Sequence, residues 1–326
     1  MKYILNETPV KTTNGFMINN LNIDLDIIEK ELSNYEIDCE YKEEIKDNFS
    51  SKIGIDHSKY KLIDINVDKD SDININSNLE TNYLVSEINI NLKENTNSNI
   101  IIRFDNEGYN NLILKINALD NSVSNITIIN NLSKDSISLI SFENDIKNSS
   151  NITINFIDLG GKIRVSNYYS TLDNYSINNF NNIHIGKSND RIDMNYHMNM
   201  NGIKSNGNIE VSGALFDESY KTFKGIIDFI EGSSRSIGYE NENTILFSNK
   251  SISRSLPMLL CHEEDVNGTH SVSTGKIDEN KLFYLMSKGL SKNESEKLIM
   301  YANFNKILNN ISVKEDIIKL IEEKMK

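Results

Sequence analysis

Cysteine, apolar runs and basic charge are all scarce in this chain of 326 residues, and each shortage excludes a class of protein. The two cysteines, Cys39 and Cys261, are far apart. They make no disulfide framework, which fits a reducing compartment. No stretch approaches the roughly 20 apolar residues that a membrane span needs, and the first residues lack the apolar segment of a secretion signal. We therefore expect a soluble cytoplasmic protein with no membrane partner.

Lys and Arg number 34 against 47 Asp and Glu, which gives a net charge of −13. Proteins that bind nucleic acids gain affinity by neutralising phosphates with basic side chains, so no nucleic acid partner is expected. The sequence also contains no GxxxxGK[ST] loop, no GxGxxG after a strand and no GxSxG elbow. These absences predict a non-enzymatic chain without a nucleotide site of its own, so that any ATP is bound by a partner.

The middle of the chain repeats. A small polar residue followed by an aliphatic-x-aliphatic triplet recurs at intervals of 27, 26, 26, 31 and 26 positions. The copies begin at Asp72, Asn99, Asn125, Asn151, Asn182 and Asn208. Compositional bias toward Asn and Ile is the alternative, but nearly equal intervals favour a solenoid whose stacked coils bury the aliphatic side chains.

Two expectations follow from this alignment of the repeats. Asparagine tolerates left-handed backbone conformations, so the asparagines are expected at the corners of the coils. His184 lies between Ile183 and Ile185 and is expected to point outward into solvent, and His197 likewise.

Both ends of the chain show helical spacing. Apolar residues between about positions 20 and 48 predict a helical cap, so we divide the chain into an N-terminal cap (1–60), a solenoid core (61–276) and a helical C-terminal segment (277–326). In the last segment Asp278 is a predicted N-cap and Gly289 a helix end. Ser291 with Glu294, and Ser312 with Glu315, predict two capping boxes. Spacing alone leaves open whether these helices cap the solenoid or bind a partner.

A run rich in metal-ligand chemistry precedes these helices. It contains Cys261, His262, Glu263, Glu264, Asp265 and His270. Thiolate and imidazole together suit iron or zinc, so Cys261, Glu263 and His270 are the candidate ligands. Cys261 has an alternative role as a small buried residue at the last rung of the core, where nearby carboxylates would raise its pKa. His270 follows the Asn267-Gly268 turn signal and is expected in a loop.

The segment after this run carries three motifs: Gly275-Lys-Ile-Asp, Leu282-Phe-Tyr-Leu and Ser287-Lys-Gly-Leu. Together they resemble the carboxy-terminal signature of the SufB/SufD family, the partners of the SufC ATPase in iron-sulfur cluster assembly. The resemblance is good from about residue 213 to residue 304. It implies a right-handed parallel β-helix for the core and a scaffold subunit of the SUF assembly complex.

The same resemblance implies roles for particular residues. His270 matches a histidine that in SufD-like members lies at the interface with SufB, where a transient cluster or iron is held. The region from 277 to 304 matches the SufC-docking helices, which gives the following docking residues: Leu282, Phe283, Tyr284, Met286, Gly289 and Leu290. ATP is then used only through SufC, and the second partner is a SufB-like chain or another copy of this chain.

The branch of the family stays open. Ser271 stands where SufB-like chains have an acidic residue, and Gly268 replaces a SufD-like cysteine, while short SufB-like proteins carry a cysteine near Cys261. Cluster type and flavin binding are not indicated. We predict a mainly β fold: a right-handed parallel β-helix, or solenoid, with α-helical N- and C-terminal segments. The rival classes are a carbohydrate-active β-helix enzyme and a structural solenoid, both of which would be expected to carry a secretion signal.

Overall fold

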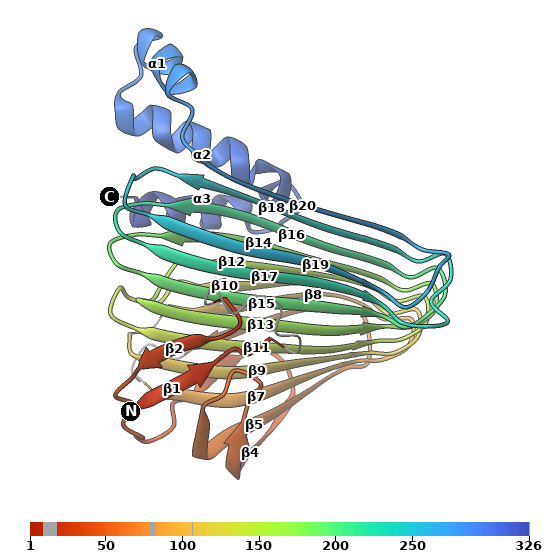
Figure 1. Cartoon of the computed structure of the whole chain (residues 1–326). Helices are drawn as coiled ribbons and strands as arrows, with labels where there is room; N and C mark the ends of the chain where they lie inside the picture. Colours follow the sequence, from red (N-terminus) through yellow and green to blue (C-terminus); the bar gives the residue numbers. More distant parts are fainter. Residues whose placement is uncertain (9–17, 78–82, 106, 326) are drawn as a thin grey trace.

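The computed structural model describes residues 1–8, 18–77, 83–105 and 107–325, which form a parallel β-solenoid flanked by helices (Figure 1). Two nine-stranded sheets make up the solenoid. Sheet 1 runs in the spatial order β20 (Asn267–Lys276), β18 (Ile237–Leu246), β16 (Asn206–Leu215), β14 (Ile177–Gly186), β12 (Asn151–Asp158), β10 (Val123–Asn130), β8 (Asn97–Phe104), β6 (Ser71–Ser77) and β3 (Tyr35–Ile37). Sheet 2 runs in the order β19 (Ile252–Cys261), β17 (Tyr220–Phe229), β15 (Arg191–Met200), β13 (Ile163–Leu172), β11 (Ile137–Ile146), β9 (Tyr109–Ala118), β7 (Tyr83–Leu92), β5 (Asp56–Val67) and β4 (Tyr41–Ser50).

Successive strands alternate between the two sheets, so each coil adds one strand to each sheet. β10, for example, pairs in parallel with β8 below it and β12 above it. The predicted solenoid is therefore confirmed. Its interior is filled by aliphatic and aromatic ladders, and burying one such side chain contributes roughly 1.5–3 kcal/mol. Tyr168 and Phe180, whose ring centroids lie 4.0 Å apart, belong to a column of rings that continues to Tyr196 and Phe223.

The predicted position of the asparagines at the corners was wrong. Asn99 and Asn125 are paired with each other inside strands β8 and β10. The left-handed corner belongs to the residues four positions before them, Asn95 and Asn121. The same corner is occupied in later coils by Ser149, Tyr175, Lys204 and Arg235, with φ between 53° and 62°. Tight stacking of the coils imposes this conformation even on residues that rarely adopt it.

The predicted N-terminal helical cap was also wrong, because the described residues of this segment form strands and loops and no helix. β1 (Lys2–Leu5) and β2 (Leu21–Asp24) make an antiparallel pair, and β4 pairs antiparallel with β5. Tyr41, Ile45 and Phe49 in β4 are spaced by four, which fits one face of a helix. A spacing of four also fits one face of a strand, whose period is two. This segment is a strand because its backbone forms hydrogen bonds with the exposed edge of β5.

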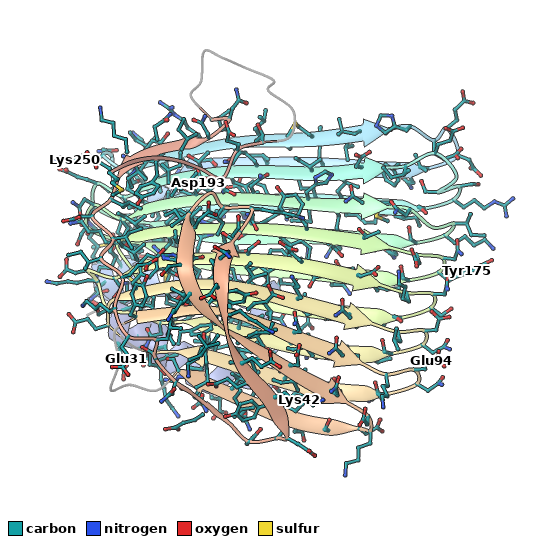
Figure 2. The ribbon with its side chains drawn as sticks, turned by 90° about the horizontal axis from the view of Figure 1, so that it is seen from below. Glu31, Lys42, Glu94, Tyr175, Asp193 and Lys250 are labelled. Atoms are coloured by element: carbon teal, nitrogen blue, oxygen red, sulfur yellow. The ribbon has the colours of Figure 1, made fainter. Side chains whose placement is uncertain are left out.

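β1 and β2 lie across the outer face of sheet 2 (Figure 2). There the segment covers a buried ion pair. Lys224 Nζ lies 2.8 Å from Asp193 Oδ1 and donates to the Asn6 carbonyl at 3.1 Å. The Asn6 amide in turn donates to Asp193 Oδ1 at 2.6 Å. These bonds partly offset the cost of burying the two charges.

Three helices follow the solenoid: α1 (Glu279–Ser287), α2 (Lys292–Leu308) and α3 (Lys314–Lys324). The Asp278 N-cap and the capping box of Ser291 with Glu294 are confirmed, and Gly289 follows the end of α1 with φ +98°. The second predicted box was wrong, because α3 begins after Val313 without a side-chain cap. Helices α2 and α3 pack on the outer face of sheet 1, where they bury Met300, Phe304, Ile307, Ile317 and Ile321 against Ile129, Ile157, Ile183 and Ile185.

Candidate functional site

The last strand of each sheet forms an open end of the solenoid. β20 has β18 as its neighbour and β19 has β17, and no described strand or helix pairs with their other edges. All residues of β20 are exposed except Val272, which is half-buried. The helices therefore do not cap this end, contrary to one of the two alternatives for them. A row of free backbone N–H and C=O groups is a template for adding a strand from another chain.

Two of the three candidate ligands lie on these terminal strands. Cys261 is the last residue of β19, opposite Phe229, and it is exposed. The alternative prediction, that Cys261 is a small buried residue of the core, is therefore wrong for the single chain. His270 lies in β20 opposite Glu240 and is also exposed. The expected loop around His270 was wrong, because the strand already begins at Asn267.

The third candidate, Glu263, lies in the turn between β19 and β20. Its carboxylate accepts hydrogen bonds from the backbone N–H groups of Asp265 at 3.3 Å, Gly232 at 3.1 Å and Glu264 at 3.0 Å. These bonds, that from Asp265 first, lower the pKa of Glu263. The carboxylate thus holds the turn together, and its role as a ligand stays a prediction.

A group that the sequence reasoning missed lies beside Cys261 on the outer face of sheet 2. His262 Nε2 is 3.5 Å from one oxygen of Asp228, and His197 Nε2 is 3.8 Å from the other. Burial lowers the pKa of His197, so this imidazole is mostly enclosed rather than solvated as expected. The two histidines come from different coils, 65 positions apart in the sequence, and no local motif joins them.

Within the ranges that the structure describes, no group of three or more His, Cys, Asp or Glu side chains is placed to hold a metal ion. Cys261 and His270 lie on different sheets, with Glu263 engaged in the turn between them. The described residues therefore do not bring the three candidate ligands together into one site.

The interior of the solenoid contains buried charged side chains near the open end, in addition to apolar ones. Lys221 shares the inward face of β17 with Phe223 and Ile227, which belong to the core. Its ammonium group is fully buried, pairs with Glu242, and also donates to the Ser253 and Ser255 hydroxyls at 3.1 Å each. Sequence reasoning missed this pair because its partners come from different strands.

Glu240 lies two residues before Glu242 on the same inward face. Burial, with the nearby Glu242 charge, raises the pKa of Glu240 to about 8. A Cβ atom at position 225 would lie 2.2 Å from Glu240 Oε1, so Gly225 leaves the space that this carboxyl group occupies. An ionisable group in such a place is a candidate for a functional role.

His184 also points into this interior, which corrects the expectation that it is solvated. It is fully buried, with Nδ1 3.0 Å from Asn182 Oδ1. Burial, together with the charges of Lys221 and Arg164, lowers the pKa of His184 well below its ordinary value. The imidazole is therefore neutral. Ile183 and Ile185 face outward instead, against the C-terminal helices.

Helix α1 projects from the solenoid and buries none of its residues (Figure 1). The side chains of Phe283 and Tyr284 are 73% and 60% exposed, and that of Met286 is 43% exposed. Leu282 and Leu290 are half-buried, and Gly289 is exposed in the turn before α2. A cavity of about 390 Å³ separates Leu282, Phe283 and Met286 from Phe247 at the solenoid. Large exposed aromatic side chains on an isolated helix mark an interaction surface.

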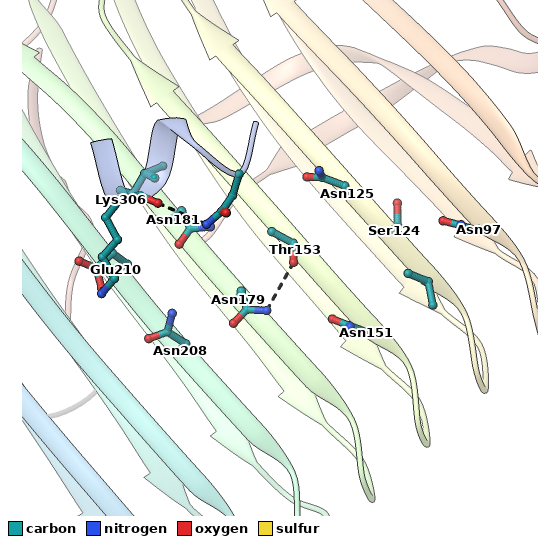
Figure 3. A pocket seen from close by; sticks show the side chains of 13 residues that line it. Asn97, Ser124, Asn125, Asn151, Thr153, Asn179, Asn181, Asn208, Glu210 and Lys306 are labelled. Carbon is teal, nitrogen blue, oxygen red and sulfur yellow. Dashed lines mark hydrogen bonds and ion pairs between the residues drawn. The ribbon is translucent and has the colours of Figure 1, made fainter. Parts of the chain in front are cut away.

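A polar groove of about 370 Å³ runs over the outer face of sheet 1 beside α2 (Figure 3). Asparagines along this face of the sheet bond one another from coil to coil: Asn181 donates to Asn155 at 2.9 Å, and Asn155 to Asn125 at 2.8 Å. Asn179 donates to Thr153, and Lys306 pairs with Glu210 at 2.5 Å. This ladder of side-chain hydrogen bonds stabilises the stacking of the coils.

Known proteins resemble this chain over much of its length. Residues 73–303 match the family described as "SUF system FeS cluster assembly, SufBD core domain". The chain is 32% identical over 128 residues to the iron-sulfur cluster assembly protein SufD of Bacillus subtilis, covering 38% of this chain and 29% of that protein. It is 27% identical over 169 residues to a SufBD family protein of Pyrococcus horikoshii, covering 51% of this chain and 37% of the relative.

A match to SufB of Bacillus subtilis is shorter, at 32% identity over 82 residues, or 24% of this chain and 17% of that protein. The aligned segments thus span well under half of each relative. In the described part of the chain, no helix is long and apolar enough to cross a membrane.

Proposed function

Because this chain belongs to the SufB/SufD family of iron-sulfur cluster assembly proteins, we propose that it is a scaffold subunit of a SUF assembly complex. In this proposal the chain performs no catalysis of its own. It carries the SufC ATPase on its C-terminal helices and pairs through the open end of the solenoid with a SufB-like chain or a second copy of itself. The complex holds iron or a transient cluster at that pairing surface.

The exposure of α1 is the observation that carries this proposal. Phe283, Tyr284 and Met286 are largely exposed, although burying them would stabilise the fold. Their exposure is explained if a partner covers them. Because α1 continues into α2, and α2 packs on sheet 1, force applied to α1 by an ATP-driven partner would be transmitted to the solenoid.

The open end supplies the second half of the proposal. Cys261 and His270 are both exposed there and lack enough companions in the described part of the chain for a metal site. A second solenoid pairing along β19 or β20 would bring its own donors next to them. Thiolate and neutral imidazole are ligands that iron accepts. ATP would enter this mechanism only through SufC.

The docking role is tested by changing Phe283 and Tyr284 together to Ala. Each side chain is a large interface anchor worth about 2 kcal/mol or more, so the affinity for SufC should fall by at least about 100-fold in a pull-down or calorimetric titration. Tyr175→Ala is the matched control, because Tyr175 is an exposed aromatic side chain at a corner of the solenoid, outside residues 277–304. Undiminished binding by a folded double variant would place the docking site elsewhere.

A further inference from the structure

A cavity of about 560 Å³ lies where three corners of the solenoid meet the end of α3. Its walls come from residues 131–135, Lys162, residues 187–190 and the last turn of α3. It shares no residue with the open end or with α1. The solenoid and α3 are in direct contact beside the cavity, because Lys187 Nζ donates to the carbonyl of Lys324 at 2.9 Å.

Four lysines line this cavity: Lys134, Lys162, Lys187 and Lys324. None of the four has a carboxylate within 4.0 Å among the described residues, although many other lysines of the chain do, such as Lys250 with Glu218. In a chain of net charge −13, four ammonium groups without an ion pair are a local reversal of charge. Positive potential focused in a concave site attracts anions.

Three acidic residues also line the cavity: Asp135, Asp190 and Glu323. Asp190 is engaged in a buried cluster: it lies 3.2 Å from the Arg164 guanidinium, which is also 3.4 Å from Asp158, and it accepts from the Lys187 backbone N–H at 3.0 Å. Apart from this cluster, the cavity faces four ammonium groups and two carboxylates. This positive excess favours an anion.

Lys324 adds an independent observation. Burial, and then the nearby Arg164 charge, lower the pKa of Lys324. The ammonium group is thus enclosed beside another cation and, within the described structure, has no hydrogen-bond acceptor of its own. An anion placed in the cavity would relieve both costs.

We propose that this cavity, here called the corner pocket, binds a phosphate-bearing small molecule, with the phosphate between Lys134, Lys162 and Lys324. Lysine binds phosphate as a point charge, and Ser133 and Ser188 in the same walls supply hydroxyl donors. The volume falls in the range of roughly 300–1,000 Å³ that is usual for small-molecule sites. Because free phosphate would fill only part of this volume, the pocket favours a phosphate ester.

Binding in the corner pocket would also fix α3 to the solenoid. Its lysines come from both sides of the contact, three from the solenoid corners and one from the helix. A ligand that bridges them stabilises the docked position of α3 by mass action. The ligand would therefore raise the unfolding temperature of the chain.

The proposal is tested by calorimetric titration of the full chain with inorganic phosphate, glycerol 3-phosphate and uncharged glycerol. Glycerol 3-phosphate should bind and glycerol should not. Lys162→Ala and Lys324→Ala should each weaken binding about tenfold, because each removes one charge partner of the phosphate. Lys93→Ala is the control, since Lys93 is exposed, pairs with Asp68 and does not line the corner pocket.

The comparison of ligands separates the two sources of phosphate. Tighter binding of the ester supports a phosphorylated metabolite, and equal binding of both supports the free anion in the same site. Absence of binding by either, or equal affinity in the unmodified chain and both lysine variants, would overturn the proposal. Thermal unfolding of each variant without ligand shows whether the pocket is still folded.

Discussion

At the scale of single residues, Glu240 is the most unusual group near the open end. Its pKa is about 8 in the folded chain, against 4.5 for an ordinary glutamate. The folded state therefore holds this proton more tightly than the unfolded state does. Between about pH 4.5 and about pH 8 the unfolded chain releases the proton first, so this group makes the fold less stable as the pH rises.

Glu240→Gln should remove that dependence, because glutamine does not titrate. We expect the variant to be more stable than the unmodified chain at pH 8 by on the order of a few kcal/mol, and the difference to shrink toward pH 4.5. Denaturant unfolding across this pH range measures it. Glu242→Gln is the contrasting control, since it breaks the pair with Lys221 and should cost about 3–5 kcal/mol. Parallel stability curves for Glu240→Gln and the unmodified chain would contradict the argument.

His270 differs from Glu240 because it is exposed. Under the proposed function, His270→Ala should leave folding and SufC binding unchanged, with a stability change within about 0.5 kcal/mol, as is usual for an exposed side chain. Cluster formation by the assembled complex should fall, as measured by visible absorption after anaerobic reconstitution. Full cluster yield from the variant would remove His270 from the proposed site.

At the scale of the element, β20 combines a regular strand with an unpaired edge. In a β-strand the N–H groups of successive residues point to opposite sides, so of Ser271 and Val272 one donates toward β18 and the other toward the open edge. Proline removes the N–H group in either case. Proline at these two positions therefore tests separately the bond that β20 makes to β18 and the proposed pairing at its open edge.

We expect one of the variants Ser271→Pro and Val272→Pro to lose unfolding free energy through the lost bond to β18. The other should keep its stability and lose association with a SufB-like chain or with itself, as measured by analytical ultracentrifugation. Undiminished association of the variant that keeps its stability would show that pairing does not use this edge.

At the scale of the whole molecule, the proposed function uses surfaces at separate places on the solenoid and its helices. Helix α1 is exposed on one side, the open end lies at β19 and β20, and the N-terminal strands cover sheet 2. Because the described residues of one chain do not assemble a metal site, cluster binding is a property of the complex in the proposed function.

Cys261 allows this to be measured. Cys261→Ala should cost less than about 0.5 kcal/mol, because the side chain is exposed in the single chain. The isolated unmodified chain should hold little iron after anaerobic reconstitution, the complex with its partners should hold a cluster, and the complex with Cys261→Ala should not. A normal cluster spectrum from the variant complex would show that Cys261 is no ligand.

The sequence by itself determined the features that depend on local chemistry. The period of about 26 residues predicted the solenoid, because stacked coils must bury one aliphatic face per strand. Asp278, Ser291 and Gly289 predicted the ends of α1 and the start of α2, because capping uses side chains within a few residues. The motifs after residue 273 predicted the family.

Only the tertiary structure decided which face of each strand is inside. In β14 both faces are buried, since α2 and α3 cover Ile183 and Ile185. The alternation of apolar residues therefore assigned these two isoleucines to the interior and His184 to solvent, which is the reverse of their positions. The pair of Lys221 and Glu242 joins residues from opposite sheets, and Tyr41 to Phe49 fits a helix or a strand equally well until β5 supplies an edge. Burial and pairing between distant segments are set by the stacking of the coils, which local sequence patterns do not contain.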